Sequence, residues 1–91
     1  MTNHTEIEQR LEALDDWEIE GLKKIYKSYK FKNFKQALEF TNKVGAVAEE
    51  MQPHPDIYLT WGKVKIEIFT HEKDSLTEAD FQLAEKIDRI A

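Results

Sequence analysis

Apolar residues along the chain change their spacing, and each change marks the start of a new element. Near the N-terminus Ile7, Leu11 and Leu14 recur at helical spacing, which predicts a short amphipathic helix. The segment 17–32 then alternates between apolar and polar positions and is interrupted near Gly21. This pattern predicts one or two strands after the first helix.

A second and longer helix is predicted from Asn33 to about Met51. Asn33 and Gln36 have the spacing of a capping box, and Pro53 prevents the helix from continuing. Gly45 costs helix stability, so we expect another element to pack closely against it. The predicted buried face consists of Phe34, Ala37, Leu38, Thr41, Val44, Gly45 and Ala48.

The C-terminal segment predicts a third helix with the same kind of start. Thr77 is placed to cap it, Asp80 lies at the third helical position, and Leu76 precedes the cap so that it can pack on Phe81. The order of elements is therefore helix, two strands, helix, two strands, helix. This order predicts an α+β fold in which helices cover one face of a four-stranded antiparallel sheet.

The last two strands read as a hairpin around Gly62. A two-residue turn with glycine first is the type II′ pattern, which selects Gly62-Lys63 as the turn and places Trp61 on the core face. A slip by one residue would expose half of the apolar face, so the hydrophobic pattern favours this pairing. The apolar pairs predicted are Trp61 with Val64, Leu59 with Ile66, and Ile57 with Ile68.

The same register places His54 directly opposite His71 at the open end of the hairpin. Pro53 and Pro55 flank His54 and hold it in an extended segment. Two imidazoles that titrate near neutral pH can serve as an acid and a base, although two histidines at a strand end can also be plain surface residues. A metal site would have only Asp56, Glu72 or Glu49 to complete it, an under-defined ligand set, so no metal is expected.

Length, charge and cysteine content limit the possible functions. The 91 residues are expected to form one domain, 1–91, and the absence of cysteine favours the cytoplasm. Apolar runs are too short to cross a membrane. Six lysines alternate with aromatic residues between Lys23 and Lys35, but a net charge of −5 argues against nucleic acid as a partner. Lysines on an outer strand face also deter edge pairing.

Four stretches of the chain resemble the pterin-4a-carbinolamine dehydratases. They are "IYKSYKFKNFKQALEF", "VAEEMQPHPDI", "VKIEIFTHE" and "SLTEADFQLAEKID". The resemblance implies an α+β domain that is usually dimeric or tetrameric. It also implies dehydration of 4a-hydroxytetrahydropterin to quinonoid dihydropterin by histidine acid and base catalysis, in support of aromatic amino acid hydroxylases, with no cofactor. The expected partners are thus a pterin substrate and further copies of the chain.

The resemblance also assigns roles to individual residues. His54 and His71 match catalytic histidines of the family. Asp80 matches an acid of the last helix, but its capping position explains it fully, so a structural role is favoured. Glu49 precedes the histidine motif and either orients an imidazole or is simply solvated. The residues expected to bind substrate are Pro55, Thr70, Glu72, Trp17 and Glu49.

One position departs from the family pattern. The family normally has its first motif histidine where this chain has Pro53, and proline has no titratable group. The alternative function is therefore a catalytically weak or inactive homologue that binds a pterin or another protein. Family members in animals bind a transcription factor and stabilise its dimer, which is the kind of interaction such a homologue would retain.

Overall fold

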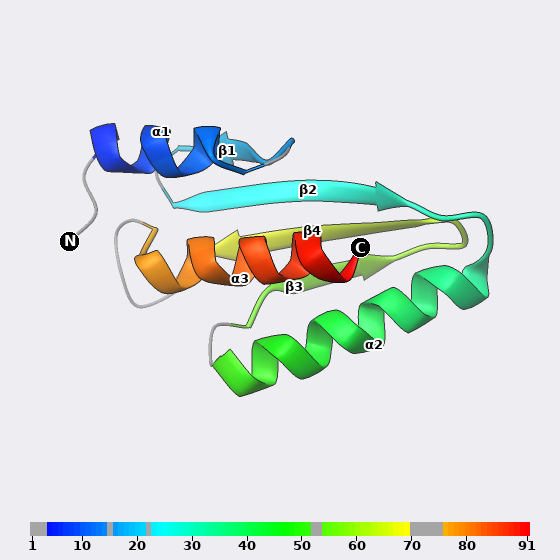
Figure 1. Ribbon diagram of the computed structural model, residues 1–91. Helices are drawn as coiled ribbons and strands as arrows, with labels where there is room; N and C mark the ends of the chain where they lie inside the picture. Colours follow the sequence, from blue (N-terminus) through cyan, green and yellow to red (C-terminus); the bar gives the residue numbers. More distant parts are fainter. Residues whose placement is uncertain (1–3, 15, 22, 52–53, 70–75) are drawn as a thin grey trace.

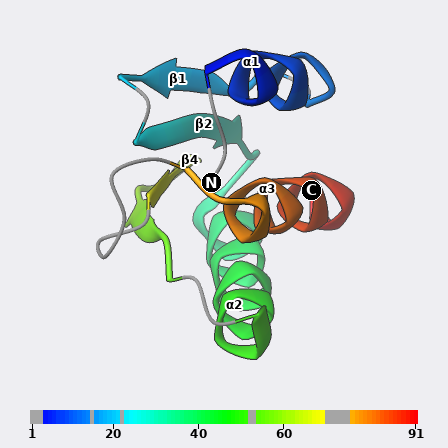
Figure 2. The same cartoon turned by 90° about the vertical axis from the view of Figure 1, so that its left-hand side faces the viewer.

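A computed structural model of the chain describes residues 4–14, 16–21, 23–51, 54–69 and 76–91. The elements are α1 (His4–Glu12), β1 (Glu18–Glu20), β2 (Lys24–Lys30), α2 (Phe34–Met51), β3 (Asp56–Leu59), β4 (Lys63–Phe69) and α3 (Glu78–Ile90). The four strands form one antiparallel sheet in the order β1-β2-β4-β3 (Figure 1). All three helices lie on the same side of this sheet (Figure 2). The predicted α+β architecture is confirmed.

The core lies between the sheet and the helices. Alternate residues of β2 and β4 point toward the helices, as Ile25, Ile66 and Ile68 do, and each is at most 1% exposed. From the helical side, Phe81 and Ile87 of α3 are fully buried against them. The opposite face of the sheet has no helix on it among the described residues, so it remains an open face (Figure 2).

Both predicted helix caps form. The Gln36 backbone N–H donates to Asn33 Oδ1 at 2.9 Å, and the Gln36 side chain in return accepts from the backbone N–H of Lys32. At α3 the backbone N–H of Thr77 donates to Asp80 Oδ2 at 2.9 Å. Each helix therefore begins where local side chains satisfy its otherwise unpaired N–H groups.

The buried face of α2 differs from the prediction. Phe34 and Leu38 are 45% and 39% exposed, whereas Phe40 is only 4% exposed. The helix packs on α3 as well as on the sheet, which turns the Phe40 side inward and the Phe34 side outward. Among the described residues, no atom of another element lies within 4 Å of the position that a Cβ on Gly45 would occupy. The expected close packing at Gly45 is wrong.

The hairpin register is also corrected. Leu59 lies opposite Val64 and Ile57 opposite Ile66, two residues away from the predicted pairing. The turn is therefore Trp61-Gly62, and neither residue has the positive φ that a type II′ turn requires. A slip by two residues keeps every side chain on its face, so the hydrophobic pattern alone does not exclude it.

Gly62 has a different use from the one predicted. The Phe31 N–H donates to the Gly62 carbonyl at 2.8 Å, and a Cβ on Gly62 would lie 3.2 Å from the Phe31 carbonyl oxygen. Glycine thus allows the turn to approach the end of β2 closely. Trp61, predicted on the core face, is 69% exposed in this turn.

Candidate functional site

His54 lies in the connection between α2 and β3. Its Nε2 is 2.9 Å from Oε2 of Glu49, which belongs to the last turns of α2. The two side chains are 67% and 81% exposed. An exposed pair of this kind adds at most about 1 kcal/mol to stability, so the contact matters more for orienting the imidazole than for holding the fold.

The contact of the Glu49 carboxylate with Nε2 of His54 determines the role left to the other ring nitrogen, Nδ1. When Nε2–H donates to Glu49, Nδ1 of the neutral ring is left as an acceptor. His54 with Glu49 therefore has the geometry of a general base with an orienting acid, open to solvent on its free side.

Three of the sequence-predicted site residues, Thr70, His71 and Glu72, lie outside the described residues, as does Pro53. Phe69, which precedes Thr70 in the chain, ends β4. Asp56 begins β3 and lies opposite Glu67 at the same end of the sheet. The predicted opposition of the two histidines relied on pairing Ile57 with Ile68, and the structure instead pairs Ile57 with Ile66. His71 lies outside the described residues, so its position relative to His54 stays a prediction.

Next to this end of the sheet, Glu67 forms a charged network on the open face. Its carboxylate is 3.0 Å from Lys65 Nζ and 3.4 Å from Lys24 Nζ, and it accepts a hydrogen bond from the Tyr58 hydroxyl. The hydrogen bond from Lys65 lowers the pKa of Glu67, against the opposing effect of burial. Lys24 also lies 5.7 Å from the centre of the Phe69 ring. The network keeps a nearly buried carboxylate ionised close to the candidate site.

Trp17, a predicted substrate-binding residue, is placed elsewhere. It is 5% exposed, and its indole N–H donates to Asp88 Oδ2 of α3 at 3.0 Å. Asp88 also accepts hydrogen bonds from Lys27 and Tyr29 of β2, and burial followed by the Asp88 hydrogen bond raises the pKa of Tyr29. Asp88 escaped the sequence analysis because a single acid in a helix carries no local signal for partners so distant in the chain.

Asp80 is 1% exposed, and its carboxylate accepts from both the backbone N–H and the hydroxyl of Thr77. These bonds give it the capping role that the sequence allowed. Pro55, the remaining predicted site residue, is half-buried beside His54. The structure thus brings together His54, Pro55 and Glu49, and it gives Trp17 and Asp80 structural contacts.

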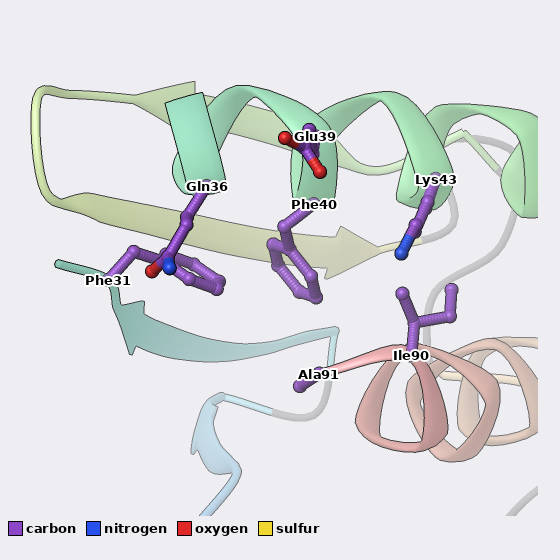
Figure 3. A pocket seen from close by; sticks show the side chains of 7 residues that line it. All are labelled: Phe31, Gln36, Glu39, Phe40, Lys43, Ile90 and Ala91. Carbon is purple, nitrogen blue, oxygen red and sulfur yellow. The ribbon is translucent and has the colours of Figure 1, made fainter. Parts of the chain in front are cut away.

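Two hollows on the helical side do not include these residues. One, of about 250 Å³, lies between α2 and α3, and Phe31, Phe40 and Ile90 form its apolar wall beside Lys43 (Figure 3). The other, of about 310 Å³, is lined in part by Asp88 and Arg89. Within the part of the chain that the structure describes, no group of three or more metal-ligating side chains is present.

Comparison with known proteins identifies the family. The sequence profile described as pterin 4 alpha carbinolamine dehydratase matches residues 1–90. The chain belongs to this family. A protein of Rubrobacter xylanophilus, provisionally named a pterin-4-alpha-carbinolamine dehydratase, is 45% identical over 93% of this chain and 79% of its own. A relative from Sulfolobus acidocaldarius with the same provisional name is 40% identical over 97% and 96% of the two chains.

Solved structures of this dehydratase family share the fold. A transcriptional coactivator/pterin dehydratase from Brucella melitensis has a TM-score of 0.91 at 32% identity, over 98% of this chain and 96% of that one. A pterin dehydratase-like protein described as a RuBisCO assembly factor in the alpha-carboxysome has a TM-score of 0.73 at 25% identity, over 85% and 90% of the two chains. Members of the fold are thus described both as dehydratases and in other roles. None of the helices in the described parts of this chain is long and apolar enough to span a bilayer.

Proposed function

We propose that this chain dehydrates 4a-hydroxytetrahydropterin to quinonoid dihydropterin, as a hydro-lyase that recycles a pterin cofactor. The observation that carries the proposal is the contact between His54 and Glu49, in a chain that belongs to the pterin carbinolamine dehydratase family. The reaction removes the 4a-hydroxyl group together with a proton from the neighbouring ring nitrogen. It therefore needs one group that donates a proton and one that accepts it, and no metal or organic cofactor is required.

Two histidines divide this work in our proposal. His54, oriented by Glu49 through Nε2, presents Nδ1 to the substrate and exchanges one proton with it. His71 is the partner that exchanges the other proton. Pro55, Thr70 and Glu72 stay as the proposed substrate-binding residues, whereas Trp17, buried with its indole N–H on Asp88, is left to its structural contact. The cytoplasm is the proposed compartment, because the chain has no cysteine to form disulfides.

Pro53 supports a second candidate function. The family normally has a histidine at this position, and proline cannot transfer a proton. One structural neighbour is described as a RuBisCO assembly factor, so the fold also occurs in a protein with a non-catalytic role. The alternative is therefore a homologue of weak or no activity that binds a pterin or another protein.

A dehydration assay with purified protein tests the first proposal. Wild type is compared with His54→Ala, His71→Ala and Glu49→Gln at equal concentration, and circular dichroism confirms that each variant is folded. We expect wild type to accelerate dehydration over buffer and each histidine variant to lose at least about tenfold, equal to about 1.4 kcal/mol of transition-state stabilisation. Glu49→Gln should lower the rate, because it weakens the contact that orients the His54 imidazole.

Glu50→Gln serves as the matched control, because Glu50 is an exposed acid next to Glu49 on the same helix. It should leave the rate unchanged. A wild-type rate equal to buffer would reject the dehydratase proposal, and titration with a reduced pterin would then separate a binding protein from one that has no pterin site. Loss of activity in the Glu50→Gln control would mean that charge in general, and not the His54 contact, controls the rate.

We also propose that the chain forms a homo-oligomer of a single domain, 1–91. Phe34 and Leu38 leave apolar surface exposed on α2, and Tyr58 is 50% exposed on β3. β3 is the edge strand of the sheet, so the backbone groups on its outer side have no partner strand among the described residues. An edge strand beside exposed apolar residues is the surface that a second copy would cover.

A further inference from the structure

Along the strands of the open face, one end carries lysines alone, whereas the other carries four acids together with Lys24. At the end near the hairpin turn, Lys30 of β2 lies directly opposite Lys63 of β4, and Lys65 follows two residues along on the same face. The acids of this face lie toward the other end, and they are Glu18, Glu20, Asp56 and Glu67. The three lysines, Lys30, Lys63 and Lys65, are called the basic end below. A chain with an acidic net charge thus presents a cationic surface at one place.

The basic end places two exposed like charges directly opposite each other. Like charges directly opposite each other in a sheet repel. Lys65 is paired with Glu67, but among the described residues no carboxylate lies within ion-pair distance of Lys30 or Lys63. Protection of a sheet edge does not explain Lys63 and Lys65 either, because β4 is an interior strand between β2 and β3. An anion bound between the strands would remove the repulsion.

One exposed aromatic side chain lies on this face, and a second lies in the adjoining turn. Tyr58 of β3 lies opposite Lys65, on the open face, and is 50% exposed. Trp61, in the turn that joins β3 to β4, is 69% exposed. Ser28 is an exposed hydroxyl beside Lys65. Cationic groups that contact phosphates, together with exposed rings on which bases stack, are the two features that bind single-stranded nucleic acid.

We propose that the basic end of the open face, with Tyr58 and Trp61, binds single-stranded nucleic acid. Lys30 and Lys63 contact phosphates, and Ser28 donates a hydrogen bond to the same backbone. Tyr58 and Trp61 stack on bases. The open face of a four-stranded antiparallel sheet is a suitable platform for splayed bases, because no helix of the described residues covers it (Figure 2). The surface is separate from the His54 contact and does not depend on the dehydratase proposal.

Fluorescence anisotropy with labelled oligo-U and oligo-dT of about 12 nucleotides tests this at about 50 mM salt and above. The double variant Lys30→Gln, Lys63→Gln removes the two unpaired cations. It should bind at least about tenfold more weakly at low salt. The slope of the logarithm of the binding constant against the logarithm of the salt concentration should become less steep by about 1.4, since each phosphate contact on a single strand contributes about 0.7. The double variant Lys35→Gln, Lys43→Gln is the control, because it makes the same change in net charge on exposed positions of α2.

The two aromatic residues give an independent measurement. Binding should quench the fluorescence of exposed Trp61 and leave that of buried Trp17 unchanged. Trp61→Phe should keep most of the affinity and lose the quenching, and Tyr58→Ala should weaken binding about tenfold through the loss of one stacked base. The proposal is wrong if wild type binds neither oligonucleotide, if the control pair weakens binding as much as the basic-end pair, or if an acidic peptide competes equally well. The last result would assign the surface to an acidic protein partner.

Discussion

Glu67 shows how a single side chain can connect three strands on the open face of the sheet. It is 9% exposed in the middle of β4, yet Lys24, Lys65 and Tyr58 supply it with hydrogen-bond donors from three strands. Lys65 also lies 5.1 Å from the centre of the Tyr26 ring, which orders it further. The carboxylate thus links the strands on the face that no helix covers, where apolar packing is absent.

Acid should remove the stabilisation that Glu67 supplies. Its pKa in the folded chain lies below the ordinary value of 4.5, so as the pH falls through this range the unfolded chain takes up a proton first. The free energy of unfolding should therefore decrease as the pH is lowered past about 4.5, and the decrease should be larger in wild type than in Glu67→Gln. Urea unfolding between about pH 3 and pH 7 measures this, with Glu50→Gln as the control. Parallel curves for wild type and Glu67→Gln would contradict the prediction.

At the residue scale, the sequence predicted the site only where its geometry is local. Glu49 and His54 are five residues apart, and the contact between them, one of the two alternatives for Glu49, is present. Trp17 and Asp88 are 71 residues apart, and no spacing rule connects them. The family resemblance assigned Trp17 to a ligand, whereas its N–H is already engaged by α3. A buried indole N–H needs a hydrogen-bond acceptor, but the sequence does not show which residue supplies it.

At the scale of elements, Asp88 of α3 joins the start of the sheet to the last helix. Its side chain is 20% exposed and that of Lys27 is 14% exposed, so solvent screens the ion pair between them only in part. The carboxylate also holds Trp17 just before β1 and Tyr29 of β2. One helical acid therefore fixes the position of α3 against two neighbouring segments of the chain.

Asp88→Asn should destabilise the fold by about 2 kcal/mol, because three donors lose a charged acceptor and Lys27 is left with no counter-ion in a partly buried place. Glu85→Gln is the control on the same helix: its ion pair with Arg10 is more exposed, at 34% and 30%, and its loss should cost less than about 1 kcal/mol. Denaturant unfolding of both variants gives the comparison. Equal losses would show that the Asp88 cluster is no stronger than a surface pair.

The order and type of the elements followed from sequence because caps and periodicity are local. The hairpin register and the buried side of α2 did not. A shift of two residues keeps the apolar face of a strand unchanged, and the observed register is accompanied by the close approach of Gly62 to Phe31, which no local pattern predicts. On α2 the apolar arc is wide enough to include both Phe34 and Phe40, and its packing against α3 selects Phe40.

At the scale of the whole molecule, the helices occupy one side of the sheet and leave two kinds of surface uncovered. One is the open face with its basic end, and the other is the flank of α2 beside the edge strand β3 (Figures 1 and 2). The first is polar and suits an anionic partner. The second is apolar and suits a second copy of the chain.

Self-association through the flank of α2 should be sensitive to Leu38. Replacement by lysine places a charge in the apolar patch, so Leu38→Lys should lower the mass measured by light scattering toward that of one chain. Ala46→Lys adds the same charge at an exposed position of the same helix and should leave the mass unchanged. A wild-type chain that is monomeric at about micromolar to millimolar concentrations would reject the oligomer proposal.

The antiparallel pairing of β2 with β4 determines how the chain must fold. Lys30 and Lys63 close one end of this central ladder, and all of α2 and β3 lies between them in sequence. Closing so long a loop costs entropy that the local β3–β4 hairpin does not require. We therefore expect the hairpin to form early and the central ladder to limit the folding rate. Neither half of the chain contains a complete sheet, so the two halves should gain and lose their structure together.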